Sequence, residues 1–192
     1  MRMERSRAAG LAMAQNRTEE LSDFDKLVQK YRPRIFRFLL ASLRSPETAE
    51  NLAQECFVRA FQGRHGFQGA AGVGTWLFQI AANLVRDHEA CGRLKFWRRA
   101  LRTSADVAEL GNAIPDRQQS PEARALIQQQ VEAVWAAAAR LPQRQRTVFL
   151  LRFVEDMDLL EIAAVTGMKI GTVKTHLFRA LQAVRARLEG IQ

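Results

Sequence analysis

The segment that most constrains the fold is Asp158–Leu188, because it predicts two helices joined by a tight turn. Asp158 can cap the first helix, and Glu161 three residues later completes a capping box. Gly167 can end that helix, since glycine readily takes the positive φ that a helix end often requires. The apolar residues that we expect to face inward are Leu160, Ala163 and Ala164 in the first helix and Val173, Leu177, Leu181, Val184 and Leu188 in the second.

The outward face of the second helix is polar and basic, with Lys174, Thr175 and Arg179 among its residues. A short helix, a glycine turn and a longer helix with a cationic face form the helix-turn-helix pattern, whose second helix enters the major groove of DNA. An ordinary helical hairpin with a solvated basic face has the same residue spacing. The pattern therefore indicates DNA binding but does not by itself distinguish it from that alternative.

The charge of the chain favours a polyanionic partner. Its 192 residues contain 29 Lys and Arg against 20 Asp and Glu, which gives a net charge of +9 and a pI of about 10.7. Such a balance suits nucleic acid first and an anionic membrane surface second. No apolar run approaches the ~20 residues of a membrane span, so we expect no direct membrane insertion and a cytoplasmic location.

Neither catalysis nor metal binding is predicted. The three histidines, His65, His88 and His176, are scattered, and the chain has no paired catalytic carboxylates and no phosphate-binding loop. We therefore expect no enzyme and no small-molecule substrate. His88 and Cys91 lie three residues apart but lack a second ligand pair, so we expect neither a metal nor a cofactor. Cys56 is expected to pack as a small hydrophobic residue.

The first half of the chain predicts helices and one loop. Residues 1–21 are charged, small and aperiodic, which predicts a disordered basic tail. The first helix contains Pro33, which we expect to kink or restart it. A second helix is expected over Pro46–Gln62, with an apolar stripe that ends at Phe61. The glycine-rich stretch Gly63–Gly74 predicts a loop before the next helix.

The second half begins after a break in periodicity. Residues 98–120 lose the helical pattern and predict a linker at a domain boundary. Further helices are expected over Pro121–Ala139 and Gln143–Val154, before the helix-turn-helix. Because no segment predicts a strand, we expect an all-α chain of two small helical domains, residues 22–97 and 121–192, joined by a flexible linker, with the helix-turn-helix in the second domain.

Four segments together resemble a known family. They are AENLAQECFVRAF, GTWLFQIAANLVRD, LPQRQRTVFLLRFVEDM and EIAAVTGMKIGTVKTHLFRA, in this order along the chain. Over residues 22–97 and 121–188 the chain resembles bacterial RNA polymerase sigma factors of the extracytoplasmic-function (ECF) group. The resemblance implies a protein without catalytic residues that binds core RNA polymerase and directs promoter-specific transcription initiation. It makes residues 22–97 sigma region 2, residues 98–120 the linker and residues 121–192 sigma region 4.

The resemblance also implies roles for individual residues. Docking on core polymerase falls to Asn51, Gln54 and Glu55, with Asn51 where the family usually has Asp. The residues matching those that read the melted, single-stranded minus-ten element are Phe67, Gln68, Trp76, Gln79, Asn83 and Arg86. The residues matching those that read the duplex minus-thirty-five element are Arg144, Arg146, Lys169, Thr172, Lys174, Thr175, Phe178 and Arg179. Members of the family are commonly held inactive by an anti-sigma factor, so such a partner is expected here.

Lys169 departs from the family pattern in a way that has a physical consequence. The family usually has a small hydroxyl residue there, which caps the recognition helix. Losing a cap typically costs ~1 kcal/mol, and a cation at a helix N-terminus opposes the helix dipole. A nearby phosphate would relieve both effects, so our hypothesis is that Lys169 contacts the DNA backbone.

A two-domain regulator with a LuxR-type helix-turn-helix is the alternative, because the segment GTVKTH occurs in that family too. Such a regulator needs a sensory or receiver domain in front of its DNA-binding domain. A receiver alternates strands with helices around an acidic pocket, whereas residues 22–97 predict helices alone.

Overall fold

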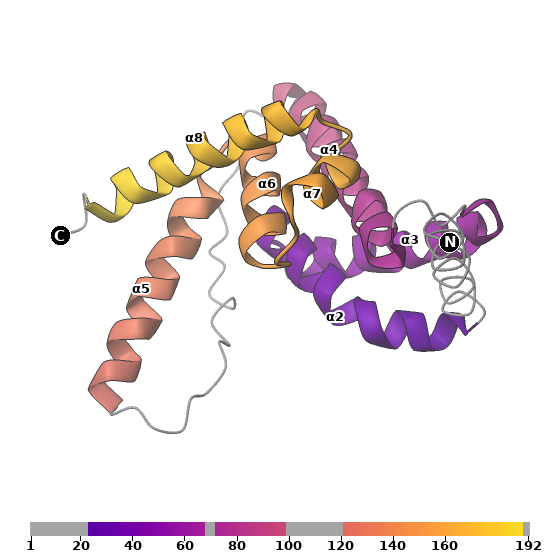
Figure 1. Cartoon of the computed structure of the whole chain (residues 1–192), viewed down its shortest axis with the longest axis horizontal. Helices are drawn as coiled ribbons and strands as arrows, with labels where there is room; N and C mark the ends of the chain where they lie inside the picture. Colours follow the sequence, from indigo (N-terminus) through magenta and orange to yellow (C-terminus); the bar gives the residue numbers. More distant parts are fainter. Residues whose placement is uncertain (1–22, 68–71, 99–120, 190–192) are drawn as a thin grey trace, which may run out of the picture.

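The computed structural model describes residues 23–67, 72–98 and 121–189, with side chains left undescribed at 92–98 and 121–128. These residues form helices and no strand, which confirms the all-α prediction (Figure 1). The predicted basic tail 1–21, the site residue Gln68 and the linker beyond Arg98 lie outside the described residues. The elements are α2 (Phe24–Leu43), α3 (Pro46–Gly63), the 3₁₀ helix η1 (Arg64–Gly66), α4 (Val73–Arg98), α5 (Pro121–Ala139), α6 (Gln143–Phe153), α7 (Leu159–Thr166) and α8 (Ile170–Glu189).

Helices α2, α3 and α4 pack on one another and make up the first half of the fold. Phe38 of α2 meets Phe78 of α4 edge to face, with ring centroids 5.6 Å apart, and both side chains are fully buried. Ser45 caps α3 as predicted, since its hydroxyl accepts a hydrogen bond from the amide of Thr48. Helix α2 continues through Pro33 as one helix, so the expected restart is not found.

Cys56 lies in the core of this first half, as predicted. The side chain is fully buried on α3, and its Sγ lies 3.6 Å from the carbonyl oxygen of Leu77, to which it donates. Burial raises the pKa of the Cys56 thiol to about 12, because the charged thiolate is poorly solvated there. Cys91 on α4 is exposed and likewise carries a free thiol. The two thiols therefore differ sharply in accessibility.

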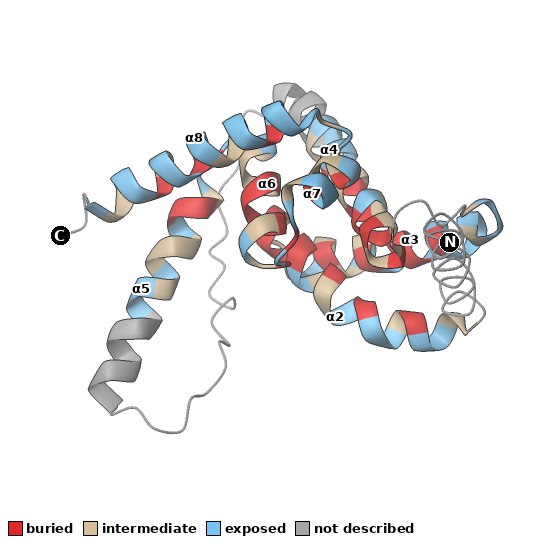
Figure 2. Cartoon of the chain, in the orientation of Figure 1, coloured by how far each residue is buried: buried red, intermediate tan, exposed pale blue. Residues whose placement is uncertain are grey.

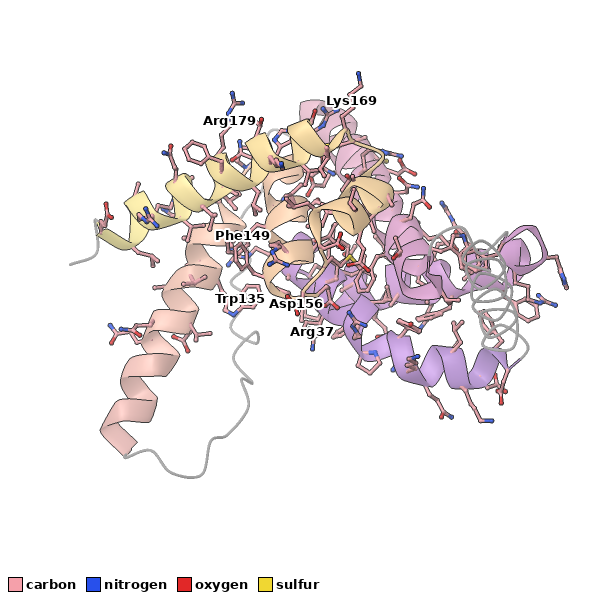
Figure 3. All side chains as sticks on the ribbon, in the orientation of Figure 1. Arg37, Trp135, Phe149, Asp156, Lys169 and Arg179 are labelled. Atoms are coloured by element: carbon pink, nitrogen blue, oxygen red, sulfur yellow. The ribbon has the colours of Figure 1, made fainter. Side chains whose placement is uncertain are left out.

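The second half contains the predicted helix-turn-helix, α7 and α8. Asp158 Oδ1 accepts hydrogen bonds from the amides of Leu160 (2.7 Å) and Glu161 (2.8 Å), and Glu161 returns one to the amide of Asp158, so the capping box is confirmed. Gly167 ends α7 with φ of 68°. Helix α8 packs on α5, α6 and α7, and Trp135 of α5 and Phe149 of α6 line the groove between their helices (Figure 3).

The prediction of which face of α7 is buried was wrong. Leu160 is 69% exposed and Ala164 is exposed, whereas Ile162 and Val165 are buried. Residues two apart on a helix point to nearly opposite sides, so burying Ile162 turns Leu160 outward. The face that contains Ile162 is selected because α7 packs against both α4 and α8. For α8 the predicted stripe holds at Val173 and Val184, while Leu181 lies at its exposed edge.

The two halves pack against each other. Helix α7 lies on α4 and α6 lies on α2, and one continuous hydrophobic cluster draws residues from both halves. Figure 2 shows the buried residues concentrated where α2, α4 and α6 meet, with the outer surface of α8 exposed. The predicted domains are thus in direct contact in this structure, and the boundary at residues 98–120 stays a prediction.

Replacing Asp158 with alanine should lower the free energy of unfolding by about 1 kcal/mol, because two amide hydrogen bonds at the start of α7 lose their acceptor. Urea denaturation followed by circular dichroism measures this loss. Asp158→Asn is the matched control, since asparagine retains a capping oxygen and should lose much less. Equal losses in the two variants would contradict the capping role.

The native protein should show one fast-reacting thiol. Thiol reagents attack the thiolate, and Cys56 is both buried and shifted to a high pKa, so only Cys91 should react at neutral pH. Absorbance after addition of an aromatic disulfide reagent counts the reactive groups, and both thiols should react in denaturant. A Cys91→Ser variant should have no fast phase, and a fast phase in that variant would show that Cys56 is accessible.

Candidate nucleic-acid and polymerase interfaces

The outward face of α8 carries exposed residues predicted to read duplex DNA. Because Val173, Ala180 and Val184 turn inward, the opposite side of the helix points to solvent. Lys169 and Arg179 project from this side, away from the rest of the molecule (Figure 3). In the described part of the chain, no acidic side chain pairs with either of them. The other residues of this face that were predicted to contact duplex DNA are also exposed: Thr172, Lys174, Thr175 and Phe178.

Lys169 stands directly before α8, as its position in the sequence predicted. Its carbonyl oxygen accepts hydrogen bonds from the amides of Thr172 (2.8 Å) and Val173 (3.1 Å). Its side chain is exposed and has no oxygen that could accept from an amide of the first turn. The cation is therefore directed at solvent beside the positive end of the helix dipole.

Arg144 and Arg146, both on α6 and both predicted to bind phosphate, differ in the structure. The side chain of Arg144 is exposed. That of Arg146 is only 15% exposed, and it donates to Glu89 Oε1 at 2.8 Å and to the carbonyl of Ala139 at 3.3 Å. Glu89 lies on α4, in the other half of the fold. Arg146 is therefore engaged across the junction between the halves and is not part of the open face of α8.

The residues predicted to read the melted minus-ten element fall into two groups. Phe67 and Trp76 stack on each other, with ring centroids 4.8 Å apart and planes tilted by 35°. Their contact joins Phe67, which directly follows η1, to the first turn of α4, and Gln79 in the next turn of α4 is exposed. Asn83 and Arg86, further along α4, instead line a cleft toward the second half.

That cleft, about 840 Å³ in volume, is lined by residues of both halves. Arg144, Thr166 and His176 contribute from the second half, facing Asn83 and Arg86. Partial burial lowers the pKa of His176, and the nearby positive charges of Arg144 and Arg179 lower it further. Residues predicted to contact the melted minus-ten element and residues predicted to contact the duplex minus-thirty-five element thus line the same cleft.

The outward face of α3 carries the three residues predicted to dock on polymerase. Asn51 and Gln54 are exposed, and Glu55 accepts a hydrogen bond from Arg59 at 2.7 Å. Gln54 donates to Glu50, which also pairs with Arg32 of α2. The face is therefore polar, nearly balanced in charge and held in place by side-chain hydrogen bonds.

Two apolar residues extend this face, and the sequence analysis missed them. Phe61, predicted to lie in the buried stripe, is 47% exposed, and Val58 is exposed beside it. Phe61 packs edge to face on Phe24 at 5.1 Å, and the guanidinium of Arg64 lies 3.6 Å from the centre of its ring. Helical spacing places Val58 in line with Asn51, so an apolar residue outside the predicted stripe was the available signal for Val58. Phe61 gave no such signal, because it fitted the stripe.

The part of the chain that the structure describes has neither a group of potential metal ligands nor a helix of membrane-spanning character. No three residues among its His, Cys, Asp and Glu side chains are grouped so that they could hold a metal ion. No helix in the described ranges combines the length and the hydropathy that a membrane span needs.

Comparison with known proteins gives matches in both halves. Residues 27–91 match the family model for Sigma-70 region 2, and residues 131–184 match that for Sigma-70, region 4. RNA polymerase sigma-H factor of Pseudomonas aeruginosa is 33% identical over 168 residues, which cover 86% of each chain. ECF RNA polymerase sigma factor SigW of Bacillus subtilis is 26% identical over 88% of this chain and 90% of its own.

Solved structures share the fold. The sigma factor RpoE of Bartonella quintana, in complex with the anti-sigma factor NepR, superposes with a TM-score of 0.68 at 19% identity, over 87% of this chain and 97% of its own. CnrH, in complex with the cytosolic domain of CnrY, gives 0.61 at 22% identity, over 94% and 97%. The chain belongs to the sigma-70 family of regulatory DNA-recognition proteins, as a sigma factor of the ECF group that directs promoter-specific transcription initiation.

Proposed function

We propose that this sigma factor docks on core RNA polymerase through α3 and reads two promoter elements with separate surfaces. Helix α8 reads the duplex minus-thirty-five element, and the loop before α4, together with α4 itself, holds the melted minus-ten element. The observation that carries this proposal is the exposed cationic face of α8, which has no acidic partner in the described residues and follows a rigid capped turn.

The duplex reader divides its work between bases and phosphates. Lys174, Thr175 and Arg179 can donate hydrogen bonds to base edges, and Arg179 can do so with two parallel bonds. Phe178, which is 60% exposed, offers an apolar surface of the kind that contacts thymine methyl groups. Thr172, Lys169, Arg144 and, once it leaves Glu89, Arg146 supply backbone contacts, which give affinity and register but little sequence information.

The minus-ten reader acts on bases that have left the stack. The Phe67–Trp76 pair fixes one edge of the loop and offers an aromatic surface at which a base can stack. Gln79 and Asn83 can donate to and accept from a base held there, and Arg86 can pair with the strand backbone. Gln68, in the same loop, belongs to this proposal on sequence grounds alone.

Polymerase binding is assigned to the outward face of α3. Asn51, Gln54 and Glu55 provide polar contacts, and Val58 with Phe61 adds the apolar area that a specific interface needs at its centre. The factor performs no chemical step and needs no cofactor, because polymerase carries out the synthesis. It works in the cytoplasm with the polymerase. An anti-sigma partner is also proposed, because the fold neighbour RpoE named above was solved in complex with an anti-sigma factor.

Purified protein added to core polymerase that lacks any other sigma factor should start transcripts at defined promoter sites. A LuxR-type regulator could not do so, since it needs a sigma factor already present. Mapped transcript ends measure the outcome and also reveal both promoter elements. Randomly placed starts, identical to those of core polymerase alone, would contradict the proposed function.

Arg179→Ala should reduce initiation from those promoters by roughly 5- to 150-fold, because a base-reading arginine typically contributes 1–3 kcal/mol. Arg185→Ala is the matched control, since Arg185 is an exposed arginine further along α8. It should retain most activity. Equal losses would show that α8 contributes only general positive charge.

Lys169→Ser should weaken binding to the minus-thirty-five duplex and lower the slope of log affinity against log salt by about 1, as expected for one lost phosphate contact. Fluorescence anisotropy across a salt series measures the slope. Lys26→Ser removes an equal charge far from α8 and should leave the slope as in the wild type. An unchanged slope in Lys169→Ser would contradict the proposed phosphate contact.

A further inference from the structure

The two halves of the chain meet at a buried carboxylate. Glu155 lies in the turn between α6 and α7, and its side chain is 0% exposed. Its Oε2 accepts a hydrogen bond from Arg34 Nε at 2.8 Å, and its Oε1 accepts one from Arg37 at 3.2 Å. Arg34 also donates to the backbone carbonyl of Glu155 at 3.3 Å. Both arginines are on α2, so the charge of one half is neutralised wholly by the other.

The geometry around Glu155 is fixed on both sides. Arg34 is held by aromatic rings of the first half, since its guanidinium lies 5.5 Å from the ring centre of Phe78 and 5.9 Å from that of Tyr31. The turn that carries Glu155 is anchored by Arg152, which donates to the carbonyl of Met157 at 2.9 Å. Figure 3 shows Arg37 beside this turn, which also carries Asp156. We call Glu155, Arg34 and Arg37 the Glu155 latch.

This contact depends on the relative position of the halves. In the described residues the Glu155 carboxylate has no hydrogen-bond donor from its own half. A buried carboxylate without a cation is strongly unfavourable, whereas the same group in water is not. The packed arrangement therefore requires both halves in register. On separation every charged group of this contact regains water, whereas the apolar area shared by the two halves becomes exposed.

In the packed arrangement, residues of both halves that are predicted to contact DNA lie at the junction between the halves. Arg146 is paired with Glu89 at 2.8 Å, in a contact where both side chains are mostly buried. Asn83 lines the cleft toward the second half and is half-buried, and Arg86 lies at the same cleft with its side chain 59% exposed. In contrast, the outward faces of α3 and α8 remain exposed.

We infer that the packed arrangement of α2 and α4 against α6 and α7 is a self-inhibited closed state, held by the Glu155 latch and opened before promoter DNA is bound. No second protein is needed to form it, because all of its contacts lie within this chain. The inhibitory part of the inference rests on the function proposed above. The closure itself does not, since it concerns only the contact between the two halves.

Closure is measured without DNA by energy transfer between two dyes. The dyes are placed at His88→Cys on α4 and Arg140→Cys just after α5, in a Cys91→Ser background, with Cys56 left in the core. Both positions are exposed, and they lie close together in the closed arrangement because Arg146 contacts Glu89 and Ala139 beside them. The wild-type protein should show mainly high energy transfer between the dyes, because most molecules are in the closed state. Arg37→Gln should raise the ratio of open to closed molecules about tenfold, because the buried carboxylate loses one of its two cations. Mainly low transfer in the wild type would overturn the inference.

Arg32→Gln is the matched control. Arg32 is an arginine of the same helix, but its partner Glu50 lies in the same half, so closure should be unchanged. Glu155→Gln is the second test, from the opposite side of the latch. Circular dichroism verifies that each variant is folded, and Arg37 is half exposed, so its variant tests the latch even where Glu155→Gln disrupts the turn. Equal transfer in Arg37→Gln, Arg32→Gln and the wild type would overturn the inference.

Binding of the free protein to duplex minus-thirty-five DNA tests the inhibitory role. Arg37→Gln should bind several-fold more tightly than the wild type or Arg32→Gln, because Arg146 is released from Glu89. A variant that opens in the transfer experiment without gaining affinity would overturn self-inhibition while leaving the proposed function intact. Failure of promoter-specific initiation would instead count against the proposed function and leave closure standing.

Discussion

Helix α4 is the element on which both halves of the structure depend. Its inner side chains, such as Leu77, Phe78 and Ala81, are fully buried in the first half, and another part of its surface receives α7. Burial of apolar area in both contacts favours a single packed body. Because Asn83 and Arg86 lie on this helix beside the cleft, part of the surface proposed to hold melted DNA borders the second half. Closure therefore limits the space around one part of that surface.

Most of the local structure could be predicted from the sequence, because the signals are local. The Ser45-Pro46 start, the Asp158–Glu161 capping box and the Gly167 helix end each depend on residues a few positions apart. The inner face of α7 was mispredicted for the opposite reason. That helix is only eight residues long and is buried by two neighbours, so its own pattern does not determine which side turns inward.

The candidate site could be predicted in part. Exposure of the α8 face follows from its periodicity, and Lys169, Lys174 and Arg179 are exposed as expected. The pairing of Arg146 with Glu89 could not be predicted, because 57 residues separate them and a charged residue on a helix surface does not reveal its partner. The same limit applies to Arg37 and Glu155, which are 118 residues apart. A resemblance assigns a role to a residue but does not say in which state of the protein that role is available.

The buried ion pairs explain why the closed arrangement has one defined register. A buried salt bridge contributes little net stability compared with apolar packing, but a buried charge without its partner is costly. The ion pairs therefore determine how the two halves are aligned more than they strengthen the contact between them. The proposed docking face on α3 is exposed in the closed arrangement, as are Lys169 and Arg179 on α8. Polymerase and the first duplex contacts can therefore engage the closed protein. Opening then has to follow for the proposed set of DNA contacts to be complete, because Arg146 can reach a phosphate only after it leaves Glu89.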